Sequence, residues 1–285
     1  MVDRKDIMRE VTLEELLEAG CHFGHQITRS NPKARDFIFE ARDNVHIIDL
    51  VKTKEGLEKA GEYVLNLASK KDSVMLVVAT KRQAKEIVLQ EVKRVKDLIK
   101  NGNLAQNDGL FYVTEKWVGG SLTNFSELSK NFEKLKNIEK QLNDPEERAR
   151  RTKKEILLLE REKNRLEELY GGIRYMTKKP DALFIIDSHL EDLAVREAGK
   201  MGVETVAIVD TNADPFVIDY PIPANDDAVG SIKLISSYIL DAWAEGKNKV
   251  EKEEKKEVKE EKVKTPKKKE VVKKKERKVK KTAKK

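Results

Sequence analysis

The chain has 285 residues, of which 39% are hydrophobic and 38% are charged, and it contains one cysteine. A single cysteine excludes an internal disulfide and fits a reducing compartment, and no stretch approaches the roughly 18 apolar residues of a membrane span. The first ten residues hold no apolar run, so we expect no signal peptide and a soluble, cytoplasmic protein with no membrane partner.

The net charge is divided unevenly along the chain. Residues 246–285 hold 20 Lys and Arg and 8 Glu, a net charge of +12, so residues 1–245 carry −5 of the total of +7. The terminal segment has no aromatic residue and only scattered valines. It has too little apolar surface to offset the entropy of ordering, and we predict a disordered basic tail. Such a tail either attracts polyanions or only keeps the protein soluble.

The first motif along the chain is "EAGCHFGHQ" at residues 18–26, which places Cys21, His22 and His25 within five positions. A zinc site needs three or four ligands, so a further ligand from a distant part of the chain would have to converge here. Adjacent Cys and His side chains rarely meet in the geometry of a nucleophilic pair. Gly20 and Gly24 permit unusual backbone angles, and we therefore expect a loop without a metal ion.

The next segment, "TRSNPKARDFIFEARDNVHIIDLVKT" at 28–53, is basic and interrupted by turn residues. Arg29, Lys33 and Arg35 lie around the turn sequence Ser-Asn-Pro at 30–32. A solvated surface loop explains this pattern, and so does a set of contacts to several phosphates.

Short apolar segments predict the strands of a sheet. Residues 73–80, 181–188 and 204–211 are the strongest candidates, and 44–50 and 109–115 are weaker ones. Helical patterns follow the first two, over 81–100 and 189–202, and Gly202 fits a helix stop. This alternation predicts an α/β fold with a parallel sheet and helices on both faces. Lys81 and Arg82 begin a helix directly after a strand, but neither glycine-rich phosphate motif occurs.

The segment "EKWVGGSLTNFSEL" at 115–128 joins the weaker candidate at 109–115 to a long helical pattern. Its two glycines at 119–120 predict a tight turn, after which Ser121 or Thr123 would cap the helix. Lys116 and Trp117 offer a cation and a flat ring, which suits contact with a sugar–phosphate or a base. Packing of Trp117 in the core is an equal alternative.

Residues 125–169 depart from the strand–helix alternation. Apolar residues recur every three or four positions over 125–142, and a second seam follows at Ala149, Ile156, Leu159, Leu166 and Leu169, with Pro145 in the first turn of the second helix. Two such helices joined by a short turn predict an antiparallel hairpin about 30 Å long. Because its other faces are densely charged, the hairpin is expected to project from the body; the alternative is two helices lying flat on the sheet.

Aspartates gather after two of the predicted strands. Asp187 and Asp210 end strands, where ligands of parallel α/β sheets bind, and a hard cation could be held by Asp210, Asp214, Asp219, Asp226 and Asp227. This pattern allows a Mg-dependent phosphoryl-transfer enzyme that uses Asp187 and Asp210. The structural alternative assigns the acids to helix caps and turns, with the prolines at 215, 221 and 223 interrupting a loop.

Several long stretches, in this order, resemble the bacterial small-subunit ribosomal protein S2 family. They cover most of residues 11–246 and read "LLEAGCHFGHQ", "NPKARDFIFEARDNVHIIDLVKT", "KWVGGSLTNF", "LEELYGGIRYMTKKPDALFIIDS" and "VDTNADPFVIDYPIPANDDAVGSI". Departures are local: Ser30 stands where the family usually has Trp, Ala34 where it has Met, and Ala79 where it has Gly.

The resemblance implies a flavodoxin-like parallel sheet with a protruding coiled-coil hairpin and a structural role without catalysis or cofactor. The expected partners are small-subunit ribosomal RNA and neighbouring ribosomal proteins, including the messenger-binding protein S1. We expect one α/β domain over 1–245, with the hairpin at about 122–170 and the tail at 246–285. The histidines at 22 and 25 would hydrogen-bond backbone or RNA, with the glycine at 24 needed for the turn. The predicted RNA-binding residues are Arg29, Lys33, Arg35, Lys81, Arg82, Lys116 and Trp117, with basic residues of the hairpin.

Overall fold

The computed structural model describes residues 9–100 and 108–250, and its centre is a five-stranded parallel sheet. The strand order is β5-β4-β6-β7-β8. Counted within this sheet alone, the order is 2-1-3-4-5, as in flavodoxin-like folds. The five strands are β4 (Met75–Val78), β5 (Leu110–Val113), β6 (Ala182–Ile185), β7 (Glu204–Val209) and β8 (Tyr220–Pro223). The three strongest strand predictions and the weaker one at 109–115 are confirmed.

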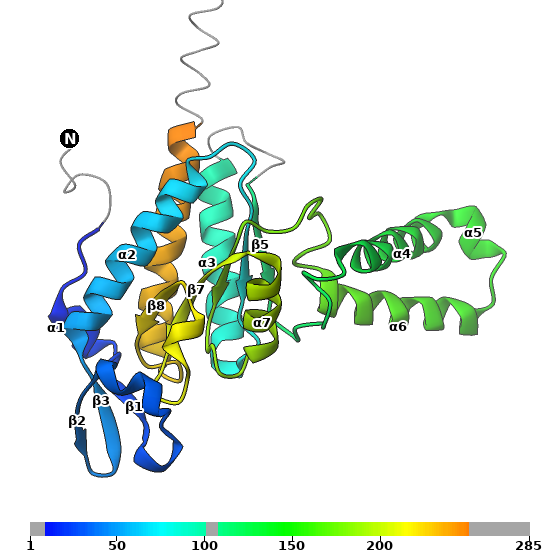
Figure 1. Ribbon diagram of the computed structural model, residues 1–285. Coiled ribbons are helices and arrows are strands. Elements are labelled where there is room, and N and C mark those ends of the chain that lie inside the picture. The colour runs from blue at the N-terminus through cyan, green and yellow to red at the C-terminus, as the bar shows by residue number, and fades with distance from the viewer. Residues whose placement is uncertain (1–8, 101–107, 251–285) are drawn as a thin grey trace, which may run out of the picture.

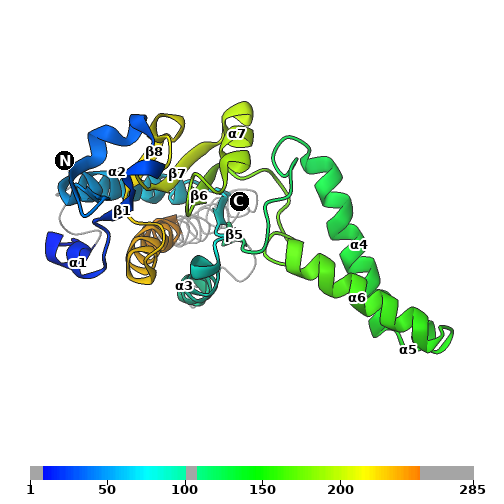
Figure 2. The same ribbon diagram turned by 90° about the horizontal axis from the view of Figure 1, so that it is seen from below.

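Two separate cores lie on the two faces of this sheet, because successive side chains of a strand point to opposite sides. Met75 and Val77 belong to one core, whereas Leu76 and Val78 belong to the other. The first core is completed by α1 (Leu13–Glu18), α2 (Leu50–Ala68), α3 (Arg82–Lys100) and a C-terminal helix over residues 229–250. The second is completed by α7 (Asp192–Met201) and the root of a helical pair, so helices cover both faces (Figure 2).

A second, antiparallel sheet of three strands precedes the parallel one. Its order is β1-β3-β2, formed by β1 (Phe23–Gln26), β2 (Ile38–Arg42) and β3 (Val45–Ile48). The prediction that 44–50 belongs to the parallel sheet was wrong, and β1 was predicted as a loop. Asp43 and Asn44 both have positive φ, at 52° and 63°, as a two-residue hairpin turn requires. That turn returns the chain beside β2 and so creates an antiparallel pair.

The loop predicted around the prolines at 221 and 223 contains the edge strand β8. Its residues pair with β7 in parallel register, with Ala207 opposite Pro221 and Val209 opposite Pro223. Proline is tolerated here because an edge strand needs hydrogen bonds on one side only. The same prolines weakened the strand pattern in the sequence.

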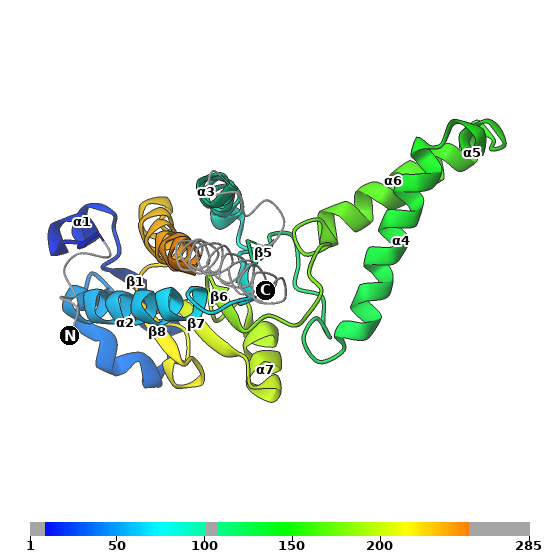
Figure 3. The same cartoon turned by 90° about the horizontal axis from the view of Figure 1, so that it is seen from above.

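The helical pair consists of α4 (Phe125–Asn143) and α6 (Lys153–Tyr170), which lie side by side and project from the body in all three views (Figures 1, 2 and 3). Phe132 of α4 packs edge-on against Tyr170 of α6, with ring centroids 6.0 Å apart. A short helix α5 (Pro145–Ala149) intervenes, and α6 begins at Lys153, after the N-cap residue Thr152, which forms a capping box with Glu155. The second helix was therefore predicted to begin too early.

The C-terminal helix runs past the predicted domain boundary at 246. Lys247 is 5% exposed, and its ammonium donates hydrogen bonds to Ser73, 3.0 Å to the carbonyl oxygen and 2.8 Å to Oγ. The first residues of the predicted tail thus belong to the folded body, and residues 251–285 lie outside the described residues. Within the described ranges, no helix is both long and apolar enough to cross a membrane.

Candidate nucleic-acid interface

The candidate interface lies at the carboxyl edge of the parallel sheet, where the N-terminal segment packs against the loops that follow β7 and β8. The 3-10 helices η2 (Ile27–Arg29) and η3 (Pro32–Phe37) connect β1 to β2. The backbone N–H of Asn31 between them donates to the carbonyl oxygen of Thr211, at 2.7 Å. Because α3 and the segment after β5 also begin at this edge, it gathers five of the predicted cations: Arg29, Lys33, Arg35, Arg82 and Lys116.

Four of these cations are available to a ligand. Arg29, Arg35, Arg82 and Lys116 are exposed, and none of their side chains makes an ion pair or hydrogen bond with another described residue. Lys33 is 58% exposed, and its Nζ lies 2.5 Å from Oδ2 of Asp214, which leads the short 3-10 helix η4 (Pro215–Val217). Exposed pairs of this kind contribute little to stability, so phosphate can replace the carboxylate as partner.

The helical pair of α4 and α6 adds a second group of free cations. Six basic side chains on α4 and α6 are exposed and without a partner among the described residues: Lys136, Lys140, Lys153, Lys154, Arg161 and Arg165. Others on the same helices are neutralised by ion pairs, as Lys134 is by Glu162. The helical pair therefore offers positive charge along its length.

Lys81 is placed differently from the exposed cations. Its side chain is 13% exposed, and its Nζ lies 3.1 Å from Asp187, 2.8 Å from Asp226 and 2.7 Å from Asp227. Burial alone lowers the pKa of this ammonium. The hydrogen bond to Asp226 and the charges of the other carboxylates outweigh burial and raise the pKa above its ordinary value. The charge of Lys81 is thus neutralised within the protein and is not offered to RNA.

His25 joins the same carboxylates from β1, not from the predicted loop. Its Nδ1 lies 3.1 Å from Oδ2 of Asp210, and its Nε2 lies 3.6 Å from Oδ2 of Asp227. The hydrogen bond with Asp210 raises the pKa of His25. We expected this histidine to hydrogen-bond backbone or RNA, but its ring makes ionic contacts with aspartates.

Gly24 also has a different role from the predicted turn. It lies in β1, where an added Cβ would stand 2.7 Å from Cγ2 of Thr211 and 3.0 Å from the carbonyl oxygen of His46. The backbone of Gly24 can therefore approach its neighbours only because it has no side chain.

The predicted cation ligands are only partly brought together. Asp214 pairs with Lys33, and Asp219 accepts the backbone N–H of Thr205, at 2.8 Å. Within residues 9–100 and 108–250, one group has ligand atoms within 4.8 Å of one another, formed by His25, Asp226 and Asp227. The ammonium of Lys81 already contacts both aspartates of this group.

Asp187, Asp210 and Asp226 organise the edge. Asp187 has a φ of 70°, and its carboxylate accepts the backbone N–H groups of His189 and Leu190, which is the predicted turn role. Asp226 is 1% exposed, and burial together with the charges of Asp187 and Asp210 raises its pKa to about 7. The arrangement is a buried charge cluster that fastens β1 to the sheet.

Trp117 is buried, so it packs in the core, which was the second of the two interpretations of its role. It is 5% exposed and lies in the second core, and its Nε1 donates to Oε1 of Glu197, 3.3 Å away. A ring in this position is not presented to a base. Neither predicted cap forms: Ser121 donates to the carbonyl oxygen of Val118, and Thr123 donates to Glu197.

Glu197 of α7 is the residue that sequence reasoning missed. It is 5% exposed and accepts five hydrogen bonds from the segment that leads into α4. Burial raises the pKa of this carboxyl, but the N–H groups of Gly120, Leu122 and Thr123 outweigh it and hold the pKa below its ordinary value. In the sequence, Glu197 is one acidic residue among several on an amphipathic helix.

Comparison with known proteins identifies the family. The model of the family described as Ribosomal protein S2 matches residues 16–246. A "Small ribosomal subunit protein uS2" from Bifidobacterium longum subsp. infantis is 44% identical over 239 residues, 84% of this chain and 80% of that protein. Its counterpart from Mycobacteroides abscessus is 46% identical over 239 residues, 84% and 81% of the two chains. That from Roseiflexus is 45% identical over 248 residues, 85% and 87%. The chain belongs to the ribosomal protein S2 family.

Proposed function

We propose that this protein is a structural constituent of the small ribosomal subunit in the cytoplasm and that it binds ribosomal RNA and neighbouring ribosomal proteins. The observation that carries the proposal is the similarity along 84% of the chain to proteins that are named for that subunit. The family is not enzymatic, so the alternative of a Mg-dependent enzyme is not retained. Recruitment of the messenger-binding protein S1 is supported by the family resemblance alone.

The proposed RNA surface is the set of free cations at the carboxyl edge, which comprises Arg29, Arg35, Arg82 and Lys116, with Lys33 beside them. The body has a net charge of −5, so binding has to depend on local patches. Two of the acids at the centre of the edge, Asp187 and Asp226, are buried around Lys81 and so add little negative charge to the exposed surface. The exposed side chains of the edge therefore carry more net positive charge than a count of all its charged residues suggests.

We further propose that α4 and α6 form a coiled-coil hairpin, inserted at about 122–170 in one α/β domain, that extends the contact with RNA or protein. The six free cations of the hairpin support RNA, because phosphate contacts position a protein on its site. The tail, for which we keep the prediction of disorder, adds non-specific attraction. Phosphate contacts of this kind make binding depend strongly on salt.

Charge reversal tests the RNA surface. The triple variant Arg29→Glu, Arg35→Glu and Lys116→Glu should lose most of the preference for small-subunit RNA over an unrelated RNA, measured as two dissociation constants across a salt series. Each lost phosphate contact also lowers the slope of log K against log salt, by about 0.9 on duplexes and about 0.7 on single strands.

Two controls separate position from net charge. The variant Lys59→Glu, Lys93→Glu and Lys200→Glu changes the charge by the same amount at exposed helical positions away from the edge, and it should keep the preference. Removal of 251–285 should flatten the salt dependence and also keep the preference. If the helical variant loses preference as much as the edge variant does, or if the truncated chain alone loses it, the proposed surface is wrong.

A further inference from the structure

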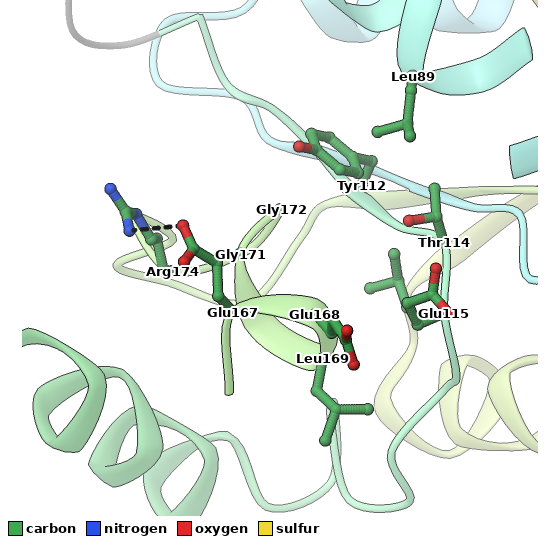
Figure 4. A pocket seen from close by; sticks show the side chains of 11 residues that line it. Leu89, Tyr112, Thr114, Glu115, Glu167, Glu168, Leu169, Gly171, Gly172 and Arg174 are labelled. Atoms are coloured by element: carbon green, nitrogen blue, oxygen red, sulfur yellow. Dashed lines mark ion pairs between the residues drawn. The ribbon is translucent and has the colours of Figure 1, made fainter. Parts of the chain in front are cut away.

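A pocket of about 260 Å³ lies at the root of the hairpin, where the end of α6 meets β5 and α3 (Figure 4). This volume is several times the roughly 30 Å³ that one water molecule occupies in the liquid, so the pocket has room for a side chain. Leu89 and Leu169 supply apolar wall, and Tyr112 supplies an aromatic ring.

The charges that line the pocket are mostly acidic. Glu115 is paired with Lys85, 2.8 Å away, whereas Glu168 is exposed and has no partner among the described residues. Among the described residues, Arg174 is the one cation that lines the pocket, and Glu139 and Glu167 already hold it, at 2.9 and 3.8 Å. The pocket thus has an excess of negative charge.

A second observation, independent of the carboxylates, points to a ligand. Thr114 is only 8% exposed, yet its hydroxyl has no hydrogen-bond partner among the described residues. Figure 4 shows this hydroxyl turned toward the middle of the pocket, with Glu115 and Glu168 on the wall below it. The residue as a whole is nearly buried, but its hydroxyl oxygen is not among the fully buried atoms, so a donor that enters the open pocket can take the place of water on it.

We propose that this pocket receives an arginine side chain from a neighbouring protein in the assembled small subunit. The inference rests on the proposed function, because it requires that assembly. A guanidinium brings five N–H donors in a planar fork, which suits the Glu168 carboxylate and the Thr114 hydroxyl together. Its plane can stack on the ring of Tyr112.

Other occupants fit less well. The phosphates of RNA would meet the free carboxylate of Glu168, and like charges repel. The apolar stem of an arginine can lie on Leu89 and Leu169 while its head reaches the acceptors, whereas a small cation would leave those leucines uncovered. The hairpin root is therefore assigned as a protein-facing surface, in contrast to the basic carboxyl edge.

Site-specific photo-crosslinking in assembled subunits tests the proposal. Leu89, which is 39% exposed at the pocket, is replaced in the full-length chain by photoreactive p-benzoylphenylalanine. Small subunits are purified on a sucrose gradient and irradiated, and the crosslinked peptides are identified by mass spectrometry. We expect a crosslink to a segment of another protein that contains an arginine within a few residues of the crosslinked position. A crosslink to ribosomal RNA, a crosslink to residues 251–285 of this chain, or no crosslink overturns the proposal.

Matched variants show whether the pocket chemistry is responsible. Glu168→Arg should reduce the crosslink about tenfold, and Thr114→Val should reduce it by a smaller factor. Glu62→Arg, at an exposed helical glutamate that also lacks a partner in the described part of the chain, should leave it unchanged. Equal crosslinking in Glu168→Arg and Glu62→Arg overturns the proposal. Co-migration of the unmodified chain with small subunits is scored separately: if it fails, the proposed function fails, and if it succeeds without a crosslink, only this inference fails.

Discussion

Removing the carboxylate of Glu197 should destabilise the junction between the body and the hairpin. Oε1 accepts the N–H groups of Trp117 and Gly120, at 3.3 and 2.7 Å. Oε2 accepts the N–H groups of Leu122 and Thr123 and the Thr123 hydroxyl, at 3.1 to 3.3 Å. Glu197→Ala leaves these donors without their acceptor, and the bonds from Trp117 and Leu122 are buried.

The size of the effect follows from the kind of bonds that are lost. A hydrogen bond to a charged group contributes about 1.5–3 kcal/mol, but five bonds to one carboxylate are not additive. A buried donor left without an acceptor costs about 1–3 kcal/mol, and two of the five bonds, from Trp117 and Leu122, are buried, so we expect Glu197→Ala to lower the free energy of unfolding by about 2–6 kcal/mol. Glu197→Gln keeps one acceptor oxygen for one of the two sets of donors, so its cost should be about half.

Urea denaturation of the isolated full-length chain measures the stability, and hydrogen exchange measures the junction directly. The amides of Gly120, Leu122 and Thr123 should exchange faster in Glu197→Ala. The control is Asp192→Ala on the same helix, where an exposed pair with Arg196 should be worth less than about 1 kcal/mol.

The pH dependence supplies an independent check. Because the pKa of Glu197 is held below its ordinary value, its stabilising contribution is present above the unfolded pKa of about 4.3. That contribution is lost as the pH falls through the folded pKa. The difference between wild type and Glu197→Ala should therefore shrink in acid. A cost below about 1 kcal/mol at pH 7 with unchanged exchange at Gly120, Leu122 and Thr123 would refute this reasoning.

Two further predictions concern the carboxyl edge. Because folded Asp226 holds its proton up to a pH of about 7, against an ordinary pKa of 3.8, the stability of the wild type should fall as the pH rises from about 4 to 7. The fall in the free energy of unfolding should be at most about 4 kcal/mol. Urea titrations of Asp226→Asn should show a free energy of unfolding that depends less on pH. An equal fall in both proteins contradicts the raised pKa of Asp226. Gly24→Ala should cost about 1–3 kcal/mol in the same assay, because its Cβ would stand 2.7 Å from Thr211. Gly199→Ala, where nothing lies within 4 Å of the added Cβ, should be neutral or stabilising; equal losses at both glycines would exclude a steric cause.

The central strands of the parallel sheet were predictable because both of their faces are buried. β4, β6 and β7 are buried on both faces, so they appear as continuous apolar runs bounded by polar residues. β1 and β8 lack that signal: β1 is four residues long and contains Gly24, and β8 has two prolines. Pairing with a neighbour, which single-sequence patterns do not encode, defines both strands.

The site was predictable in part, for a related reason. Arg29 and Arg35 lie in a basic segment of the sequence and remain exposed in the structure. Lys81 carries the same charge, but its partners Asp226 and Asp227 are about 145 positions away in the chain and meet it only through the fold. Glu197 likewise depends on a contact about 75 positions distant, with the N–H of Leu122. Long-range pairing of charges therefore decides which predicted residues are free to bind.

Sedimentation shows whether the chain is built into the small ribosomal subunit. An epitope-tagged full-length chain, expressed in a bacterial cell, is followed through a sucrose gradient of the lysate at low and at high salt. We expect co-migration with small subunits at low salt, partial release at high salt, and weaker co-migration for the triple variant Arg29→Glu, Arg35→Glu and Lys116→Glu. A chain that stays at the top of the gradient at low salt, while the endogenous ribosomal proteins sediment with their subunits, would contradict this expectation.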